Sequence, residues 1–308
     1  MDYGVHLPLM DLGGRPGPYG VSSIMPRPPR TWASGPSRRT TTCASPRPWL
    51  DGPTALAAVL AVTQRMDLVT TVAPPVVRGP VPLAKSLAAI DLLSGGRLVV
   101  GVGPGSSARH YAAVGVPFEE RWKRLHEAAP ALRALLESET PPFEGEFYST
   151  QGLTLEPYPA HRPPIWIGSW GSEAGLRRTA RLGDGWIASA YNTTPEAFAS
   201  ALGRLREHLR AAGKDPDRFP NAISTMFFYV SEDRATAERI IKDVLGPMLN
   251  RPEEELRRRI LVGPARECAE KLAAYHAAGA RRIFLWPVED ETRQLTMFRE
   301  QVVPLVPT

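Results

Sequence analysis

The residues that decide the fold are Pro82–Gly105, PLAKSLAAIDLLSGGRLVVGVGPG. In the first part, apolar residues recur at spacings of three and four and predict a helix with one buried face: Leu83, Leu87, Ile90 and Leu93. Gly95-Gly96 ends this helix, because glycine readily adopts the left-handed backbone of a helix stop. The apolar run Leu98–Val102 predicts a strand buried on both faces, and the glycine-rich loop Gly103–Ser107 follows it. This order of elements is one unit of an α/β protein.

Similar units recur along the whole chain. Further strands are predicted at Tyr3–Leu9, Leu68–Val72, Ile165–Gly168, Gly185–Ala188, Ile223–Val230 and Arg282–Trp286, with helical patterns between them. Alternation of this kind over some 300 residues favours a single (β/α)8 barrel domain, residues 1–308. A doubly wound open sheet is the alternative. The alternating aromatic residues within Pro141–Tyr158 predict a hairpin insertion.

One segment interrupts the pattern. Residues 15–48 contain no Asp, Glu or Lys, are rich in Pro, Arg, Ser and Thr, and show neither helical nor strand periodicity. Such a composition is typical of disordered chain, and a connection of this length is unusual inside a compact domain. The second βα unit of the barrel is therefore expected to be scrambled here. A missing second strand would leave its neighbours with unpaired edges.

The composition restricts the class of protein. The net charge of +5 is spread along the chain, and the densest basic run, Arg257–Arg259, follows Glu253–Glu255 as on a solvated helix face. This pattern does not predict nucleic-acid binding. The two cysteines, Cys43 and Cys268, lack metal-ligand spacing and indicate a reducing compartment. No apolar run approaches the roughly 20 residues of a membrane span, and no signal peptide is recognisable. We expect a cytoplasmic protein without a metal.

Candidate site residues lie where the predicted strands end, since barrel sites form there. They are His6, Thr71-Val72-Ala73, Gly103–Ser107 and Gly168–Ser172. The last loop precedes a helix, whose N–H groups and dipole suit a phosphate. His6 is either a proton donor or substrate contact, or a hydrogen-bonded core histidine.

No Ser-His-Asp, Cys-His or paired-carboxylate set is recognisable, so His6 is the one catalytic candidate. A phosphate site without an acid/base set indicates a cofactor that brings its own chemistry. A sugar-phosphate enzyme on the same barrel is the alternative.

Several stretches in this order resemble the luciferase-like family of flavin-dependent oxidoreductases. They are LAKSLAAIDLLSGGRLVVGVGPG, GVPFEERWKRLHEA, FEGEFY, PPIWIGSWGSEAGLRRTARLGDGWIASA and IFLWPVEDETRQLTMF. The likeness covers nearly everything after Trp49, together with the first strand. It implies a (β/α)8 barrel with insertions, a homodimer, and reduced FMN or the deazaflavin coenzyme F420 as cofactor.

The resemblance also implies roles for particular residues. Thr71 and Val72 match a bulge, often with a non-prolyl cis peptide, that closes the third strand under the flavin ring. Two loops would hold the phosphate or ribityl chain: Gly103, Pro104, Gly105 and Ser106, and Ser169, Trp170 and Gly171. Some deazaflavin-using members have a catalytic Glu where this chain has Ser106, so that role is not transferred.

The implied activity is oxidation of a small organic substrate. With reduced FMN, which a separate flavin reductase would supply, the reaction would use O2. With F420 it would be hydride transfer. A flavin-binding barrel without turnover, inactivated by loss of the second strand, is the alternative.

Family members have a helix, a Leu-Gly-Phe turn and a second strand where this chain has residues 15–48, and the strand often ends in Asn-Asp-His. GC-rich codons can be chosen for Arg30–Thr42 so that the same DNA, read two bases later, encodes Asn-Leu-Gly-Phe-Gly-Pro-Val-Ala-Ala-Asn-Asp-His. Our hypothesis is that Arg15 to about Ser45 is a frameshifted version of this unit. Resequencing the gene tests it, and an unbroken frame encoding the printed chain would contradict it.

Overall fold

The computed structural model describes residues 1–7, 35–38 and 50–307, with the backbone alone for 35–38. A parallel sheet forms its centre, and each strand pairs with the next in a single order. This order is β1 (Asp2–Val5), β9 (Arg282–Pro287), β7 (Asn221–Val230), β6 (Gly185–Ser189), β5 (Ile165–Gly168), β4 (Leu98–Val102), β3 (Leu68–Thr71) and β2 (Gly35–Arg38). The short strand β8 (Leu261–Gly263) pairs with β7 outside this order.

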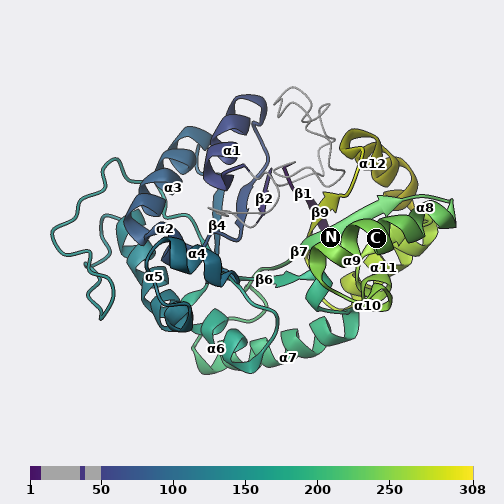
Figure 1. Cartoon of the computed structure of the whole chain (residues 1–308). Helices are drawn as coiled ribbons and strands as arrows, with labels where there is room; N and C mark the ends of the chain where they lie inside the picture. Colours follow the sequence, from purple (N-terminus) through teal and green to yellow (C-terminus); the bar gives the residue numbers. More distant parts are fainter. Residues whose placement is uncertain (8–34, 39–49, 308) are drawn as a thin grey trace.

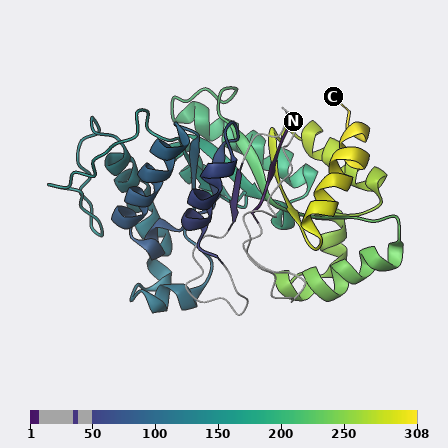
Figure 2. The same cartoon turned by 90° about the horizontal axis from the view of Figure 1, so that it is seen from above.

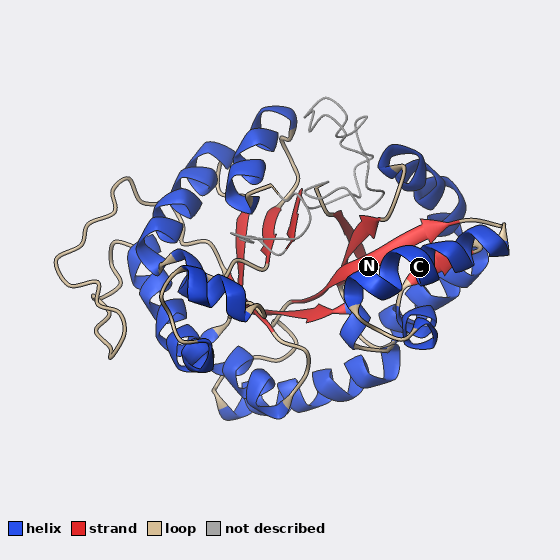
Figure 3. Ribbon diagram, in the orientation of Figure 1, coloured by secondary structure: helices blue, strands red, loops and turns tan. Residues whose placement is uncertain are grey.

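Helices surround the strands (Figures 1 and 3), and the view from above shows them on both flanks (Figure 2). They are α1 (Gly52–Val59), α2 (Pro75–Arg78), α3 (Pro80–Ser94), α4 (Ala108–Ala113), α5 (Arg121–Leu136), α6 (Glu173–Leu182), α7 (Pro195–Ala211), α8 (Arg234–Arg239), α9 (Gly246–Leu249), α10 (Glu253–Arg259), α11 (Ala265–Ala277) and α12 (Glu291–Met297). The predicted (β/α)8 fold is thereby confirmed. β1 and β2 end the strand order, and no ladder joins them within the described ranges, so the sheet is a curled, incompletely closed barrel.

The expectation of a missing second strand is wrong. β2 pairs in parallel with β3, from Gly35 opposite Leu68 to Arg38 opposite Thr71. A parallel ladder uses main-chain groups, so the free edge of β3 accepts a segment whose side chains show no strand pattern. The other predictions for residues 15–48, including the position of an Asn-Asp-His end, concern residues that lie largely outside the described ones.

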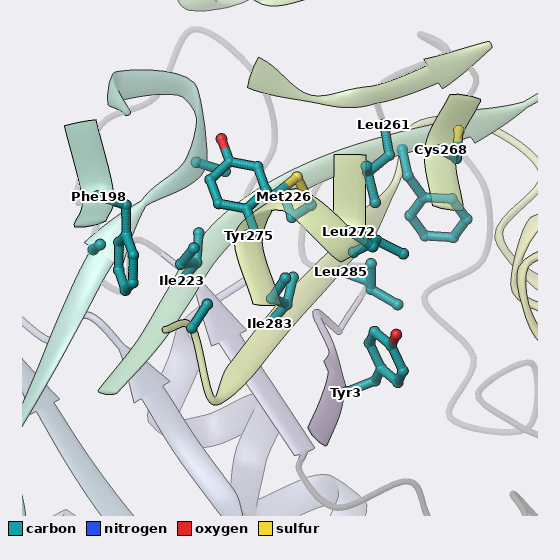
Figure 4. Packing of buried hydrophobic residues seen from close by; sticks show 14 of the residues in the cluster. Tyr3, Phe198, Ile223, Met226, Leu261, Cys268, Leu272, Tyr275, Ile283 and Leu285 are labelled. Atoms are coloured by element: carbon teal, nitrogen blue, oxygen red, sulfur yellow. The ribbon is translucent and has the colours of Figure 1, made fainter. Parts of the chain in front are cut away.

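Side chains from six neighbouring strands, β3, β4, β5, β6, β7 and β9, fill the barrel interior. The buried members of this cluster are Val69, Val99, Trp166, Ile187, Ala222 and Phe284. A larger cluster packs the outer faces of β7 and β9 against α11 and its neighbours, with Tyr275, Leu272 and Cys268 on the helix side (Figure 4). Burial raises the pKa of the Cys268 thiol to about 12, so this cysteine is a small apolar core residue.

The aromatic-rich insertion contains an antiparallel bridge between Glu144 and Ser149. The Glu127 carboxylate on α5 accepts hydrogen bonds from three backbone N–H groups at its turn: Glu146, Phe147 and Tyr148. The segment that carries the insertion projects beyond α3 and α5, away from the sheet (Figure 1). None of the helices within the described ranges has the length and hydrophobicity that a membrane span needs.

The buried face of α3 differs from the predicted one at its end. Leu83, Leu87 and Ile90 are buried as expected, but Leu93 is 74% exposed. At 100° per residue, position 94 rather than 93 continues the row of Leu83, Leu87 and Ile90. The adjoining polar position, Asp91, is also buried. Its Oδ1 has a partner there, since it accepts a hydrogen bond from the Leu98 N–H at 3.2 Å.

Asp91 therefore joins the end of α3 to the start of β4, and its substitution tests that link. Asp91→Ala leaves the Leu98 N–H buried without an acceptor and should cost about 1–3 kcal/mol of unfolding free energy. Burial raises the pKa of the Asp91 carboxyl, so the folded protein favours the protonated form. The stability that this preference contributes is present at low pH and is lost as pH rises through the raised pKa. Asp91→Asn keeps the acceptor without the charge and should be at least as stable as the parent at pH 7. Urea unfolding measures both, and equal losses for Ala and Asn would contradict this account.

Candidate functional site

A bulge closes β3 where the strand reaches the carboxyl edge of the sheet. Val69 pairs with Val99, but the next bridge joins Ala73 to Val102, so β3 contains one more residue than β4 between the two pairs. The peptide bond between Thr71 and Val72 inside this bulge is cis, although no proline is involved. The predicted bulge and its cis peptide are therefore present, while the role of these residues stays a prediction.

Val72 is the point at which three strand ends meet. A Cβ added at Gly103, after β4, would lie 2.7 Å from Val72 Cγ2. A Cβ added at Gly168, at the end of β5, would lie 3.0 Å from Val72 Cγ1. Both distances are shorter than ordinary side-chain contacts, so a Cβ at Gly103 would force Val72 to shift, and a Cβ at Gly168 would press tightly against it. The ends of β3, β4 and β5 thus converge on one aliphatic side chain.

The loop after β4 is held from below by main-chain and aromatic contacts. The Gly103 N–H donates to the Ala73 carbonyl at 3.1 Å. Gly105 has a φ of 76°, a conformation that favours glycine. The hydroxyl of the buried Tyr111 donates to the Pro104 carbonyl, and burial raises the pKa of this phenol, which keeps it protonated as the donor. Ser106 is exposed at the tip.

The loop after β5 forms the start of α6. Ser172 is its N-cap, and its Oγ accepts a hydrogen bond from the Gly175 N–H at 3.3 Å. Ser169 is buried, and its carbonyl accepts from Trp186 Nε1 at 3.1 Å. Gly171 has a φ of 87°, while Trp170 is 60% exposed. The loop is therefore rigid, with a helix N-terminus directed at the carboxyl edge, as an anion site requires.

Charges near this helix start are balanced. Glu173, in the first turn, lies 2.6 Å from His208 Nε2 and 3.6 Å from Arg204 Nη1. The other guanidinium nitrogen of Arg204, Nη2, donates to the Gly171 carbonyl at 3.0 Å. These contacts partly offset the carboxylate, which would otherwise repel an anion at the same helix end.

His6 lies one residue beyond β1 and is only 2% exposed. Its Nε2 accepts a hydrogen bond from the Thr225 N–H at 3.3 Å, so this nitrogen carries no proton in this arrangement. Its ring lies 4.9 Å from the Trp286 ring, centroid to centroid. His6 is thus a buried, hydrogen-bonded histidine just beyond the end of β1.

A polar chain next to His6 was not predicted from the sequence. Thr225, with a φ of 66°, lies in an irregular part of β7, and its Oγ1 is 2.9 Å from Ser189 Oγ at the end of β6. Asn192 Nδ2 donates to the same Ser189 Oγ at 3.2 Å, and Arg251 Nη2 donates to Asn192 Oδ1 at 2.8 Å. Ser189 could have been found from its place at a strand end. Thr225 carries no comparable signal, because it lies within a long apolar strand.

These residues fit a flavin or deazaflavin. Val72 could give a planar ring an apolar support, and the glycines beside it let Val72 lie close against the ends of β4 and β5. The loop after β4 and the first turn of α6 could supply backbone N–H groups for a phosphate-bearing chain, from residues other than Gly103, Ser169 and Gly171, whose N–H groups already donate within the protein. Within the described residues, no group of three or more His, Cys, Asp and Glu side chains is placed to hold a metal ion.

Comparison with known proteins agrees with this geometry. The family model for luciferase-like monooxygenases matches residues 39–282. The F420-dependent glucose-6-phosphate dehydrogenase of Kineococcus radiotolerans is 31% identical over 293 residues, covering 84% of this chain and 86% of that protein.

Two solved structures share the fold. Monooxygenase RslO1 from Streptomyces bottropensis has a TM-score of 0.78 and 24% identity, covering 99% of both chains. The oxygenating constituent of 3,6-diketocamphane monooxygenase from Pseudomonas putida, in complex with FMN, has a TM-score of 0.70 and 15% identity, covering 100% of this chain and 99% of that one.

The predicted family is confirmed, and the relatives named above include an F420-dependent enzyme and a protein solved in complex with FMN. The family match spans most of the chain. The chain belongs to the luciferase-like monooxygenase family.

Proposed function

We propose that this protein is an oxidoreductase that binds coenzyme F420 at the carboxyl edge of its barrel and oxidises a small organic substrate by hydride transfer. The observation that carries the proposal is the convergence of β3, β4 and β5 on Val72, which provides one support for a planar ring. The similarity to an F420-dependent dehydrogenase over most of both chains favours F420 over FMN. When bound, the cofactor supplies the hydride acceptor.

The chain's own residues orient the cofactor. Thr71 and Val72 would support one face of the ring. The loops Gly103–Ser106 and Ser169–Gly171 would hold the phosphate-bearing chain through backbone N–H groups and the start of α6. The substrate would then lie on the free face of the ring, on the side of His6 and Trp286, where closely packed aromatic side chains exclude water.

His6 is the proposed catalytic residue. Oxidation of an alcohol by hydride transfer releases a proton, and an unprotonated imidazole nitrogen at the substrate would accept it. In the present arrangement Nε2 accepts from the Thr225 N–H, so the substrate hydroxyl would replace that donor.

An FMN-dependent monooxygenase using O2 and a flavin reductase is the competing activity. Calorimetric titration of the purified protein with F420 and with FMN, followed by assays with glucose 6-phosphate and with O2, separates the two. Tight binding of F420 and its reduction by a substrate would support our proposal. Tight binding of FMN alone would favour the monooxygenase. Retention of a cofactor without any turnover would favour the non-catalytic barrel. Loss of the second strand no longer supports that alternative, because β2 pairs with β3.

We also propose that the protein is a homodimer. The exposed positions of α1 and α3 include Ala57, Ala58, Ala89, Leu92 (38% exposed) and Leu93 (74% exposed), with Lys85 as a charged position among them. Such a surface is typical of an interface. Sedimentation analysis tests it, and a monomer at micromolar concentration would contradict it. A cytoplasmic location stays a prediction from the cysteine content.

The Val72 support can be tested by filling the space beside it. Gly103→Ala puts a methyl group 2.7 Å from Val72 Cγ2 and should push Val72 toward the ring. Overpacking of this kind costs about 1–3 kcal/mol. If the displaced Val72 must move back before the ring can bind, that cost falls on binding, and the affinity for the cofactor should fall by about five- to hundredfold. Gly203→Ala on α7, where a Cβ would meet nothing within 4 Å, is the matched control. Unchanged affinity in a folded Gly103→Ala protein would contradict the placement of the ring.

The proposed catalytic role of His6 can be separated from its role in packing. His6→Gln retains an acceptor for the Thr225 N–H but cannot serve as an imidazole base. It should bind F420 with the affinity of the parent, whereas the rate of F420 reduction by substrate should fall by about 10²–10⁴-fold. Calorimetry and single-turnover absorbance measure the two quantities. A parental rate would show that His6 is a core residue only.

A further inference from the structure

Helices α5 and α6 lie side by side (Figure 1). Basic side chains follow one another along the contact between them. The guanidinium carbon of Arg178 on α6 lies 4.3 Å from the centroid of the Trp122 ring on α5, and Trp122 is 40% exposed. One turn further down, Arg181 contacts the His126 ring through Nη2 and Nδ1. We call these four residues, Trp122, His126, Arg178 and Arg181, the basic ladder.

The ladder carries positive charge without an acidic partner. Among the described residues, no carboxylate forms an ion pair with Arg178 or Arg181, and Arg178 Nε is buried without a hydrogen-bond partner. Burial and then the charge of Arg181 lower the pKa of Arg178. Burial and both arginines lower the pKa of His126. Like charges are therefore held together at an electrostatic cost that a bound anion would relieve.

The acidic side chains in the adjoining turns are already engaged. Glu127 on α5 accepts backbone N–H groups of the insertion, and Glu173 on α6 contacts Arg204 and His208. Other half-buried arginines have an oxygen acceptor, either a carboxylate, as Arg133 has in Asp184 at 3.2 Å, or a carbonyl or amide oxygen, as Arg97 and Arg251 have. The uncompensated charge of the ladder is therefore not a general property of this arginine-rich chain.

The ladder begins beside the proposed phosphate site. Ser172 caps α6, and at 1.5 Å per residue Arg178 and Arg181 lie roughly 9 and 13 Å further along the helix. An extended chain of about four residues spans that distance. An anionic chain that left the phosphate at the start of α6 would thus pass Arg178 first and Arg181 next.

We propose that the basic ladder binds the oligoglutamate tail of coenzyme F420, which extends beyond the phosphate of that cofactor. FMN ends at its phosphate and leaves the ladder empty, so the ladder selects the deazaflavin. The inference rests on the proposed function, because it takes the phosphate to lie at the start of α6. The carboxylates of the tail pair with Arg178 and Arg181, and the exposed face of Trp122 holds Arg178 in place through a cation–π contact.

The expected contribution is modest and depends on salt. An ion pair at a solvent-exposed surface contributes little, and two such pairs correspond to about a three- to tenfold change in affinity. Because these charges are near the surface, the contribution should fall as ionic strength rises.

The test compares three ligands by isothermal titration calorimetry: F420 with several glutamates, F420 without glutamates, and FMN. The ladder variant is Arg178→Gln with Arg181→Gln. The matched control is Arg266→Gln with Arg293→Gln, which removes the same charge from exposed sites on α11 and α12. Circular dichroism checks that both variants are folded.

The parent should bind tailed F420 about three- to tenfold more tightly than tailless F420, and the difference should disappear in high salt and in the ladder variant only. Equal binding of the two F420 forms by the parent would overturn the inference while leaving the proposed function intact. An equal loss in the control variant would overturn it as well, because the effect would then reflect net charge. Failure of every form to bind would remove the proposed function and the inference together.

Discussion

The packing of Val72 against Gly103 and Gly168 is the contact on which the site depends. β3 has one more residue than β4 between two successive pairs, and Val72 in this bulge lies against the glycines that follow β4 and end β5. The two glycines allow this approach, since a Cβ at either position would lie within 3.0 Å of the valine. The rest of the proposed cofactor site, the loop above Tyr111 and the start of α6, extends outward from this point.

The two halves of the carboxyl edge differ in chemistry. The half formed by β3, β4 and β5 consists of an aliphatic support and backbone donors, with few side-chain functional groups. The half formed by β1, β6, β7 and β9 contains His6, Ser189 and Thr225, linked by hydrogen bonds within a buried region. A cofactor that brings its own reactivity would need only support from the first half, while substrate recognition and proton transfer would fall to the second.

Much of this arrangement could be predicted from local sequence. The strand β4 and its loop follow from an apolar run bounded by glycines, and Ser169–Gly171 follows from its place between a strand and a helix. Three features could not be predicted in this way. β2 forms through main-chain pairing with β3, which its side chains do not signal. Leu93 is exposed because the helix period carries the buried row to position 94. Thr225 depends on an irregularity in β7 that only the pairing with β9 reveals.

β3, β4 and β5 should all end in one cofactor site. Hydrogen–deuterium exchange of the protein, with and without F420, tests it most directly, because backbone amides that bind or lie under the cofactor exchange more slowly. We expect slower exchange in residues 71–73, 103–107 and 169–174 together, with little change in α10 and α11. Slower exchange confined to other segments, or no change on adding F420 at saturating concentration, would contradict the account.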